Sequence, residues 1–301
     1  MASPPLVKDT KYIPVDYIRG EVINTNPDDL MKYLQNNWNE RYFHTHFTGD
    51  QVSKTTFHRK NIKVTFYPSG RTIIGGSFHK YANMGVHNFD QYDEQTFHRT
   101  LAELEVETSL RPENIRITGL EYGVNITPPL PTREILNRCF QHRGMEMEQT
   151  ITRYDGKYIR AIHDAYELKL YDKAAQYHLP NEVFRIEIKT TNWSRNRRNG
   201  IITLSDFIKC QKTPFVCNLI ERWNDVLFAD PTTDYGQRWH KYTNPEYWRE
   251  LKQGSRTNFH RHWQRMRSMS EMKGDNIQNT VANLIAETVQ NLQMGTNTTF
   301  I

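Results

Sequence analysis

Residues 166–193 read YELKLYDKAAQYHLPNEVFRIEIKTTNW. Two segments of alternating apolar and polar residues, ELKLY at 167–171 and FRIEIK at 184–189, stand on either side of a polar connection. Strict alternation is typical of a β-strand with one buried face. A connection of this length lets the two strands pair with each other, so the stretch predicts two neighbouring strands of an antiparallel sheet.

The two faces of this strand pair differ in chemistry. Successive side chains of a strand point to opposite faces, so Leu168 and Leu170 are expected to face a core. The opposite face is expected to carry Glu167, Lys169, Tyr171, Arg185, Glu187 and Lys189. The sequence therefore predicts a sheet face that gathers carboxylates, cations and a tyrosine.

An earlier strand, IRITGLEYGVNI at 115–126, places Glu121 and Asn125 opposite its apolar residues. A basic and aromatic strand end (FHKY at 78–81, KLYDK at 169–173) is followed in each case by a strand with a glutamate on its polar face. We expect an α/β (α+β) fold with an antiparallel sheet, flanking helices and two related α/β halves, followed by a basic helical C-terminal region.

Composition predicts three regions. The Pro-rich residues 1–30 are expected to form an irregular N-terminal arm, 31–230 the α/β domain, and 231–301 a basic helical region. Nine Lys or Arg against three Asp or Glu lie between Arg238 and Lys273, a local excess larger than the net charge of +5 of the whole chain. Such a region is suited to nucleic acid.

The cysteine pattern and the search for targeting segments indicate the compartment in which the protein is expected. The three cysteines have no ligand-like spacing and predict neither a disulfide framework nor a zinc site. We expect no signal peptide and no membrane-spanning segment, and a cytoplasmic location.

The polar sheet face suits phosphoryl transfer. Glu121 and Glu187 could bind Mg²⁺ or Mn²⁺, which prefer oxygen ligands, and the metal would polarise a phosphodiester. Tyr171 becomes a nucleophile when cations such as Lys169 and Lys173 favour its phenolate. The alternative is a solvated sheet face with cross-strand charge pairs. ATP hydrolysis is not expected, because GGSFHK at 75–80 lacks the spacing of a phosphate-binding loop.

KLYDKAAQYHLPNEVFRIEIK, preceded by LEYGVNI, resembles the replication initiators of rolling-circle plasmids and filamentous-type phages over residues 62–230. The resemblance implies that Tyr171 nicks one DNA strand at an origin, stays joined to the 5′-phosphate and later rejoins the strand. It also implies that Glu121 and Glu187 belong to a metal centre. Tyr177, in the connection, remains a competing nucleophile.

Two pairs of histidines are candidates to complete the expected metal site. Relatives in the wider nicking superfamily carry His-hydrophobe-His on a strand, and the nearest match here is His44 and His46. Those two precede the expected sheet core, so surface histidines are the alternative. His79 and His87, in a polar segment after a strand, are the other candidate ligands.

DNA is the expected partner, single-stranded or as an origin. The cations expected to contact it are Arg185, Lys189, Arg195, Arg197, Arg198, Arg256, Arg261, Arg265 and Arg267, with the last four on one stripe of a helix. A host replication helicase and a second copy of the chain are further candidate partners. Three rival functions stay open: a nucleic-acid-binding protein without cleavage, a metal-dependent nuclease that uses water, and a purely structural interaction protein.

Overall fold

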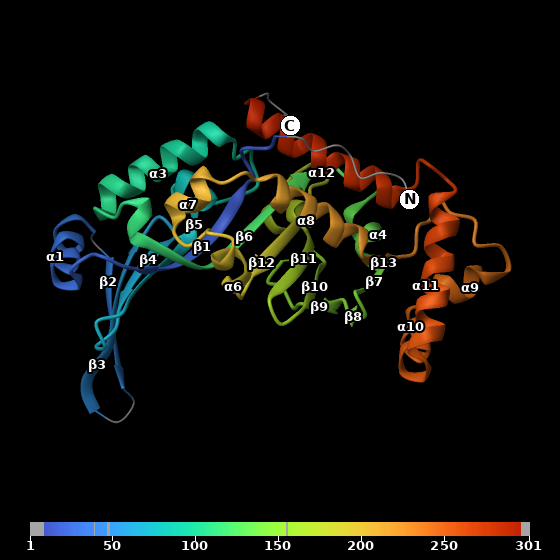
Figure 1. Ribbon diagram of the computed structural model, residues 1–301, viewed down its shortest axis with the longest axis horizontal. Coiled ribbons are helices and arrows are strands. Elements are labelled where there is room, and N and C mark those ends of the chain that lie inside the picture. The colour runs from blue at the N-terminus through green and yellow to red at the C-terminus, as the bar shows by residue number, and fades with distance from the viewer. Residues whose placement is uncertain (1–8, 39, 47–48, 155, 296–301) are drawn as a thin grey trace.

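The computed structural model describes residues 9–38, 40–46, 49–154 and 156–295, with side chains at all of these except 40, 41 and 43–53. Within these residues, ten strands form one antiparallel sheet (Figure 1). In order across the sheet they are β2 (Glu40–His46), β3 (Gly49–Arg59), β4 (Ile62–Phe66), β5 (Thr72–Ser77), β1 (Val15–Val22), β6 (Ile115–Ile126), β12 (Phe184–Thr190), β11 (Tyr166–Asp172), β10 (Tyr158–Ile162) and β9 (Glu148–Gln149).

A smaller antiparallel sheet stands beside the large one. Its strands, in order, are β13 (Val226–Phe228), β7 (Cys139–His142) and β8 (Met145–Glu146). The helices are α1 (Pro27–Asn37), α2 (Phe78–Ala82), α3 (Glu94–Thr108), α4 (Thr132–Asn137), α5 (Lys173–Tyr177), α6 (Ser194–Arg198), α7 (Leu204–Lys209), α8 (Thr213–Asn224), α9 (Trp239–Tyr242), α10 (Pro245–Gly254), α11 (Arg256–Glu271) and α12 (Ile277–Met294), with short 3-10 turns at Pro112–Asn114 and Gly236–Arg238.

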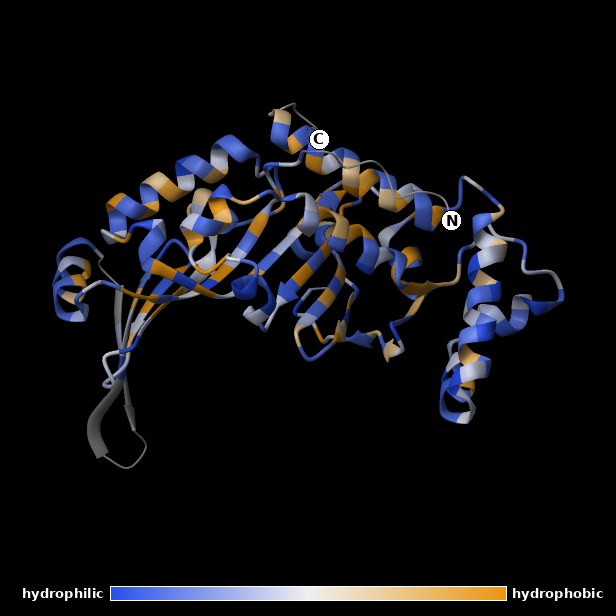
Figure 2. Cartoon of the chain, viewed as in Figure 1, coloured by the Kyte–Doolittle hydropathy of each residue, from blue (hydrophilic) through white to orange (hydrophobic). Residues whose placement is uncertain are grey.

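One face of the large sheet is covered by helices. The helices α3, α7, α8 and α12 lie along this face, and α8 and α12 pack on β12 and β6 (Figure 1). The apolar residues of these strands point toward the helices; Leu168, Leu170, Ile186 and Val124 are all fully buried. Apolar and polar residues alternate along the strands (Figure 2), as the sequence predicts. The α/β fold with an antiparallel sheet and flanking helices is confirmed, while the two related halves stay a prediction.

The opposite face of the central strands carries the polar residues. β11 and β12 pair with Lys169 directly across from Glu187 and Tyr171 across from Arg185. β12 also pairs with β6, which brings Glu121 onto the same face. The predicted pairing of three strands is therefore present, and it sets the position of the site.

Part of the irregular arm expected over residues 1–30 is regular structure in the described residues, which begin at residue 9. Residues 15–22 form β1, which lies in the middle of the sheet between β5 and β6. The physical reason is the sequence after Pro14: Val15 and Ile18 are buried on one side of a strand that hydrogen-bonds on both edges. The proline-rich composition around this strand hides it from a compositional prediction.

The C-terminal region is helical, as expected, but it is divided. A separate core of Tyr235, Tyr242, Trp248 and Phe259 holds α9, α10 and α11 together at one end of the molecule. The last helix, α12, packs back on α8 and the large sheet. None of the helices described is both long and apolar enough to cross a membrane.

Candidate active site

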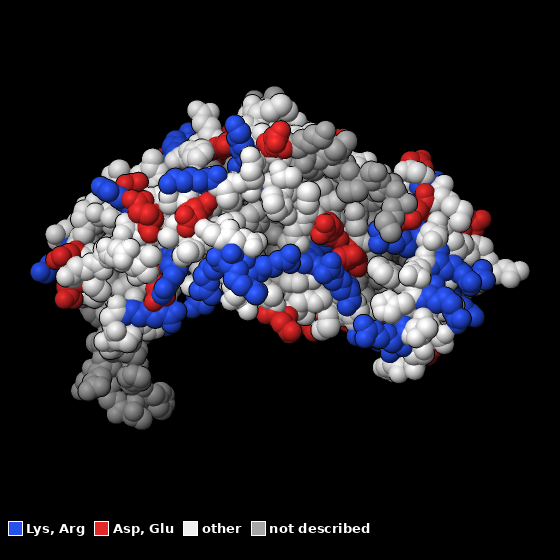
Figure 3. All heavy atoms as spheres, viewed as in Figure 1, with Lys and Arg blue, Asp and Glu red and all other residues white. Residues whose placement is uncertain are grey.

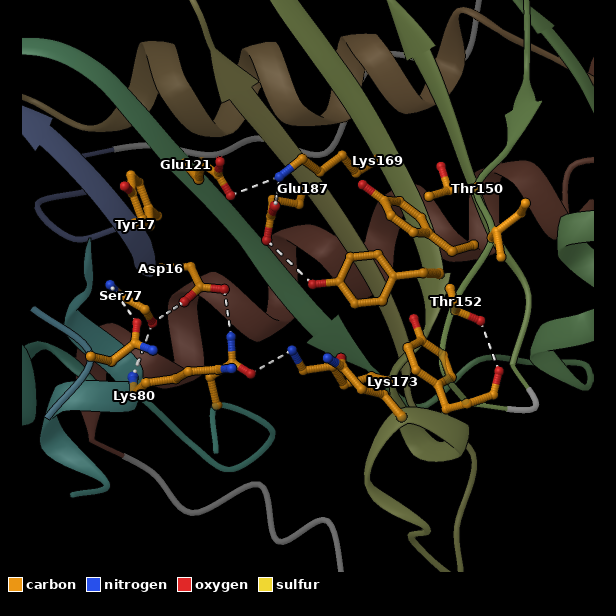
Figure 4. A pocket seen from close by; sticks show the side chains of 17 residues that line it. Asp16, Tyr17, Ser77, Lys80, Glu121, Thr150, Thr152, Lys169, Lys173 and Glu187 are labelled. Atoms are coloured by element: carbon orange, nitrogen blue, oxygen red, sulfur yellow. Dashed lines mark hydrogen bonds and ion pairs between the residues drawn. The ribbon is translucent and has the colours of Figure 1, made fainter. Parts of the chain in front are cut away.

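Lys169 lies between the two predicted carboxylates. Its Nζ is 2.7 Å from Oε2 of Glu121 and 2.9 Å from Oε1 of Glu187 (Figure 4). The side chains of Lys169, Glu121 and Glu187 are 13%, 17% and 2% exposed, so this triple interaction is largely removed from water. The three residues come from β11, β6 and β12, the three strands that sequence alternation brings together.

Arg185 holds the other side of Glu187. Its Nε and Nη2 donate to Oε2 of Glu187 at 3.2 and 3.1 Å, and its Nη2 lies 3.6 Å from Oδ2 of Asp16. Tyr171 donates its hydroxyl to the same Glu187 oxygen at 3.5 Å. Glu187 is therefore the centre of the site, with a cation on each side.

Asp16 and Asn88 extend the network toward α2 and α5. Asp16 accepts from the hydroxyl of Ser77 at 2.5 Å and from Nδ2 of Asn88 at 2.6 Å. The Oδ1 of Asn88 accepts from Nζ of Lys173 at 2.7 Å and from the hydroxyl of Tyr177 at 2.8 Å. The sequence analysis does not identify Asp16, because it predicts an irregular arm where the structure has β1.

The charges of the site are strongly coupled. Burial raises the pKa of Glu121 to about 7, the negative charge on Glu187 adds to this, and Lys169 only partly offsets it. Burial also opposes the ionised form of Glu187, but Lys169 and Arg185 outweigh it and hold the pKa of Glu187 well below its ordinary value. Burial lowers the pKa of Lys173 to about 7. Two groups of the site therefore titrate near neutral pH.

A cavity of about 400 Å³ opens onto this network. Its walls carry Glu121, Glu187 and Lys169 from the sheet, Lys173 from the start of α5, and Thr150 and Thr152 from the segment before β10 (Figure 4). The tyrosines that line it are Tyr17, Tyr154, Tyr158 and Tyr171. Several hydroxyls therefore share one open space with the charged centre.

Tyr158 is a site residue that the sequence interpretation missed. It lies directly across from Tyr171 in the β10–β11 pair, with the ring centroids 5.2 Å apart. The sequence does contain a signal for Tyr158. Apolar and polar residues alternate in YIRAI at 158–162, and this alternation places Tyr158 on the same face of the strand as Arg160. Burial raises the pKa of Tyr158 to about 12, and the strongest charge acting on it is the cation of Lys169, which lowers it.

The electrostatic surroundings of Tyr171 are different. Burial is again the largest cause of a raised pKa, but here the strongest neighbouring charge is the carboxylate of Glu187, which raises the pKa further. A phenolate is therefore better supported at Tyr158 than at Tyr171. The role predicted for Tyr171 stays a prediction, with Tyr158 as a competitor in the same cavity.

The predicted metal set of two glutamates and two histidines is not assembled. His79 is buried, lies 2.7 Å from Oδ1 of Asp90 through its Nε2, and stacks on Tyr92. His87 approaches the same Asp90 oxygen at 3.5 Å. In the part of the chain described, no three histidine, cysteine or acidic side chains come together as a metal site. The reason is local, because Asp90, in the loop after α2, interacts with both histidines.

His44 and His46 are on β2, and their side chains lie outside the described residues.

The predicted DNA-contacting cations of β12 and α6 fall into three groups. Arg185 is 2% exposed and bound to Glu187, so its prediction as a DNA contact is wrong, and it positions carboxylates instead. Lys189 pairs with Glu167 at 2.9 Å and is partly exposed. Arg195, Arg197 and Arg198 are exposed on α6. Figure 3 shows Lys and Arg side chains in a band across this face of the molecule, reaching the C-terminal helices.

The four arginines of α11 do not form one stripe. At about 100° per residue, Arg256 and Arg267 share one side of the helix, whereas Arg261 and Arg265 lie on another. Arg267 pairs with Glu271 at 2.9 Å. The residue spacing alone already places these arginines on two sides of the helix. The single predicted stripe is therefore wrong for a reason that lies in the sequence and not in the tertiary structure.

No protein-family profile matches the sequence, and no curated protein matches it. Among solved structures, the chain is similar to a rolling circle replication initiator protein from Geobacillus stearothermophilus, with a TM-score of 0.42 and 11% identity. The match covers 79% of this chain and 94% of that chain.

Proposed function

We propose that this chain is a replication initiator that cleaves and rejoins one DNA strand through a tyrosine–phosphate intermediate. The observation that carries the proposal is the single cavity in which tyrosine hydroxyls, two coupled carboxylates and two buried lysines meet on the open face of the sheet. Buried charge of this kind is costly and concentrates at functional sites. The resemblance of the KLYDK and FRIEIK segments to rolling-circle initiators points the same way.

The reaction is a transesterification. The tyrosine oxygen attacks phosphorus and forms a bond to it, the bond from phosphorus to the 3′-oxygen breaks, and the tyrosine proton is taken up by a base of the site. The 3′-oxygen leaves as a hydroxyl after receiving a proton. Lys173, whose pKa is about 7, lies in the cavity wall and can exchange this proton near neutral pH. The ammonium of Lys169 supports the phenolate.

A divalent ion at the carboxylate pair is the second part of the proposal. Glu121 and Glu187 converge on one point, which the ammonium of Lys169 occupies, so a bound metal would have to replace this ammonium. These two residues would hold Mg²⁺ or Mn²⁺, which would polarise the phosphodiester. His79 and His87 are not part of this proposal.

The test is formation of a covalent adduct. Labelled single-stranded oligonucleotides tiled over the replicon that encodes the chain are incubated with Mn²⁺ and run on a denaturing gel. Wild type is compared with Tyr158→Phe, Tyr171→Phe and Tyr177→Phe. We expect an adduct that one of the first two substitutions abolishes, and that Tyr177→Phe, which removes a hydroxyl bonded to Asn88, leaves in place.

Each rival predicts a different gel. Cleavage without an adduct in wild type identifies a nuclease that uses water and contradicts the tyrosine mechanism. Binding without product across the whole replicon identifies a DNA-binding protein that does not cleave. An adduct lost in Tyr158→Phe but kept in Tyr171→Phe assigns the nucleophile to Tyr158, and the converse assigns it to Tyr171.

A further inference from the structure

A second cavity lies between α11 and the turn that joins β7 to β8. Its volume is about 570 Å³, within the range of ligand-binding pockets. The apolar part of its wall comes from Met145, Leu227, Phe259 and Trp263. None of these residues belongs to the cavity of the candidate active site.

Aromatic and basic side chains of α11 form one stripe along this cavity. Arg256, His260 and Trp263 are spaced at i, i+4 and i+7, which places them on one side of a helix. All three line the cavity, and the next residue of the stripe, Arg267, has its guanidinium 5.9 Å from the ring centre of Trp263. The stripe combines a surface for stacking with positive charge.

The charge around the cavity is mainly positive. Arg143, Lys252 and Arg256 line it, against the single carboxylate of Asp225. Asp225 is already paired with Arg143, whose Nε lies 2.6 Å from its Oδ2, and Lys252 donates to the carbonyl oxygen of Gly144. The wall therefore has an excess of two cations, which favours an anionic ligand over an apolar or basic one.

One chain segment connects this cavity to the candidate active site. Met145 lines the cavity at α11, Glu146 and Met147 line a smaller cavity of about 200 Å³, and Thr150 and Thr152 line the active-site cavity. At about 3.3 Å per residue, residues 145–152 span at most about 23 Å. A single DNA strand a few nucleotides long covers this distance.

We infer that the cavity between α11 and the β7–β8 turn binds a base of the single-stranded DNA that leads away from the active site. The base stacks on Trp263, and Arg256 and Lys252 contact the adjoining phosphates. An aromatic ring beside cations is the usual chemistry of single-strand recognition, because every base has a face that stacks and every linkage carries a charge. This inference rests on the proposed function for the identity of the DNA, but binding at the cavity does not require cleavage.

The test measures binding of a short fluorescein-labelled oligothymidylate by anisotropy at two salt concentrations. We expect Trp263→Ala to weaken binding roughly tenfold, the loss typical of one stacked base. Arg256→Ala should weaken binding and lower the salt dependence by about one released ion. Arg261→Ala is the charge-matched comparison: it removes the same charge from the other side of the same helix, where Arg261 contacts Asn258, so its effect measures what a cation of α11 outside the cavity contributes.

The result that overturns the inference is affinity in Trp263→Ala and Arg256→Ala equal to that of Arg261→Ala, which would leave the cavity to a protein partner. If Trp263→Ala does not fold, Trp263→Phe decides. Quenching of tryptophan emission by saturating DNA in wild type, lost in Trp263→Phe at unchanged affinity, supports stacking, and equal quenching in both overturns it.

The two proposals fail separately. If no tyrosine-dependent adduct forms but oligothymidylate binding depends on Trp263, the proposed cleavage fails and the binding site stands. If the adduct forms while Trp263→Ala binds like the Arg261→Ala control, the binding site fails and the cleavage stands.

Discussion

The ionised form of Glu121 is expected to lower the free energy of unfolding of the protein. Above neutral pH it is ionised, buried and close to the negative charge of Glu187, and its pKa is raised to about 7 from an ordinary 4.5. Because one pKa unit corresponds to about 1.4 kcal/mol, the ionised form costs about 3 kcal/mol of folding free energy at pH 8. Glu121→Gln, which resembles the protonated form in shape, should therefore be more stable than wild type at pH 8 by up to about 3 kcal/mol.

The sign follows from proton binding. Between pH 4.5 and 7 the folded chain holds more protons on Glu121 than the unfolded chain does, so the free energy of unfolding falls as pH rises through this interval. The advantage of Glu121→Gln should accordingly be small at pH 5 and full at pH 8. The assay is urea unfolding of both proteins at the two pH values with EDTA present, since a bound metal would stabilise the ionised carboxylate.

Glu187→Gln is the matched control, and its effect should have the opposite sign. The pKa of Glu187 is held well below its ordinary value, because Lys169 and Arg185 outweigh the burial, so its ionised form contributes stability above pH 4.5. Removing that charge should destabilise the protein at pH 8 by about 3 kcal/mol, the lower end for a broken buried ion pair. Equal destabilisation by both substitutions at pH 8, or an effect of Glu121→Gln that does not depend on pH, would refute the reasoning.

Four further outcomes are expected. Arg185→Met should cost about 3 kcal/mol in urea unfolding, because it leaves two buried carboxylates without their shared cation. Gly123→Ala should cost about 3 kcal/mol and abolish the adduct, because its Cβ would lie 2.1 Å from the carbonyl oxygen of Ile186, while Gly119→Ala, with 3.1 Å to its nearest backbone atom, should cost less. Trp248→Ala should destabilise the C-terminal helices by about 3–5 kcal/mol, seen as helical circular dichroism lost at lower urea. The lowered pKa of Lys173 means that the unfolded chain binds more protons between pH 7 and 10.5, so the free energy of unfolding should rise over this range and Lys173→Met should remove the rise.

The parts of the fold set by local alternation were predictable. Residues 115–126 form β6 with the predicted bounds, and Lys169 and Glu187 meet on the polar face because side-chain phase fixes which face a residue takes. The same phase rule would have included Tyr158 had it been applied to β10. Sequence periodicity therefore contained the group of Glu121, Lys169 and Glu187 at the centre of the candidate site.

Strand alternation does not predict which other segments of the chain pack over a sheet face. Arg185 was expected to reach DNA because it lies on the polar face, but Asp16 from β1 and Gly123 and Asn125 from β6 surround it. His79 was expected to reach the glutamates, but it interacts with Asp90, eleven residues later in the loop that follows α2. Both errors concern contacts between segments whose relative position only the folded chain defines.

If the chain acts as proposed, the two groups that titrate near neutral pH, Glu121 and Lys173, give the site a way to respond to DNA and metal. A DNA phosphate entering the cavity adds negative charge beside Lys173 and so favours its ammonium form, which is the form that can protonate a leaving oxygen. The same phosphate disfavours the ionised form of Glu121, whereas a divalent ion between the carboxylates favours it. Substrate and metal therefore act on the ionisation of Glu121 in opposite directions: phosphate alone favours its protonated form, and a divalent ion alone favours its ionised form. A site that contained Lys169 and Glu187 alone would have no group near its midpoint at neutral pH, so under the proposed function the costly burial of Glu121 and Lys173 would couple proton binding to the arrival of DNA.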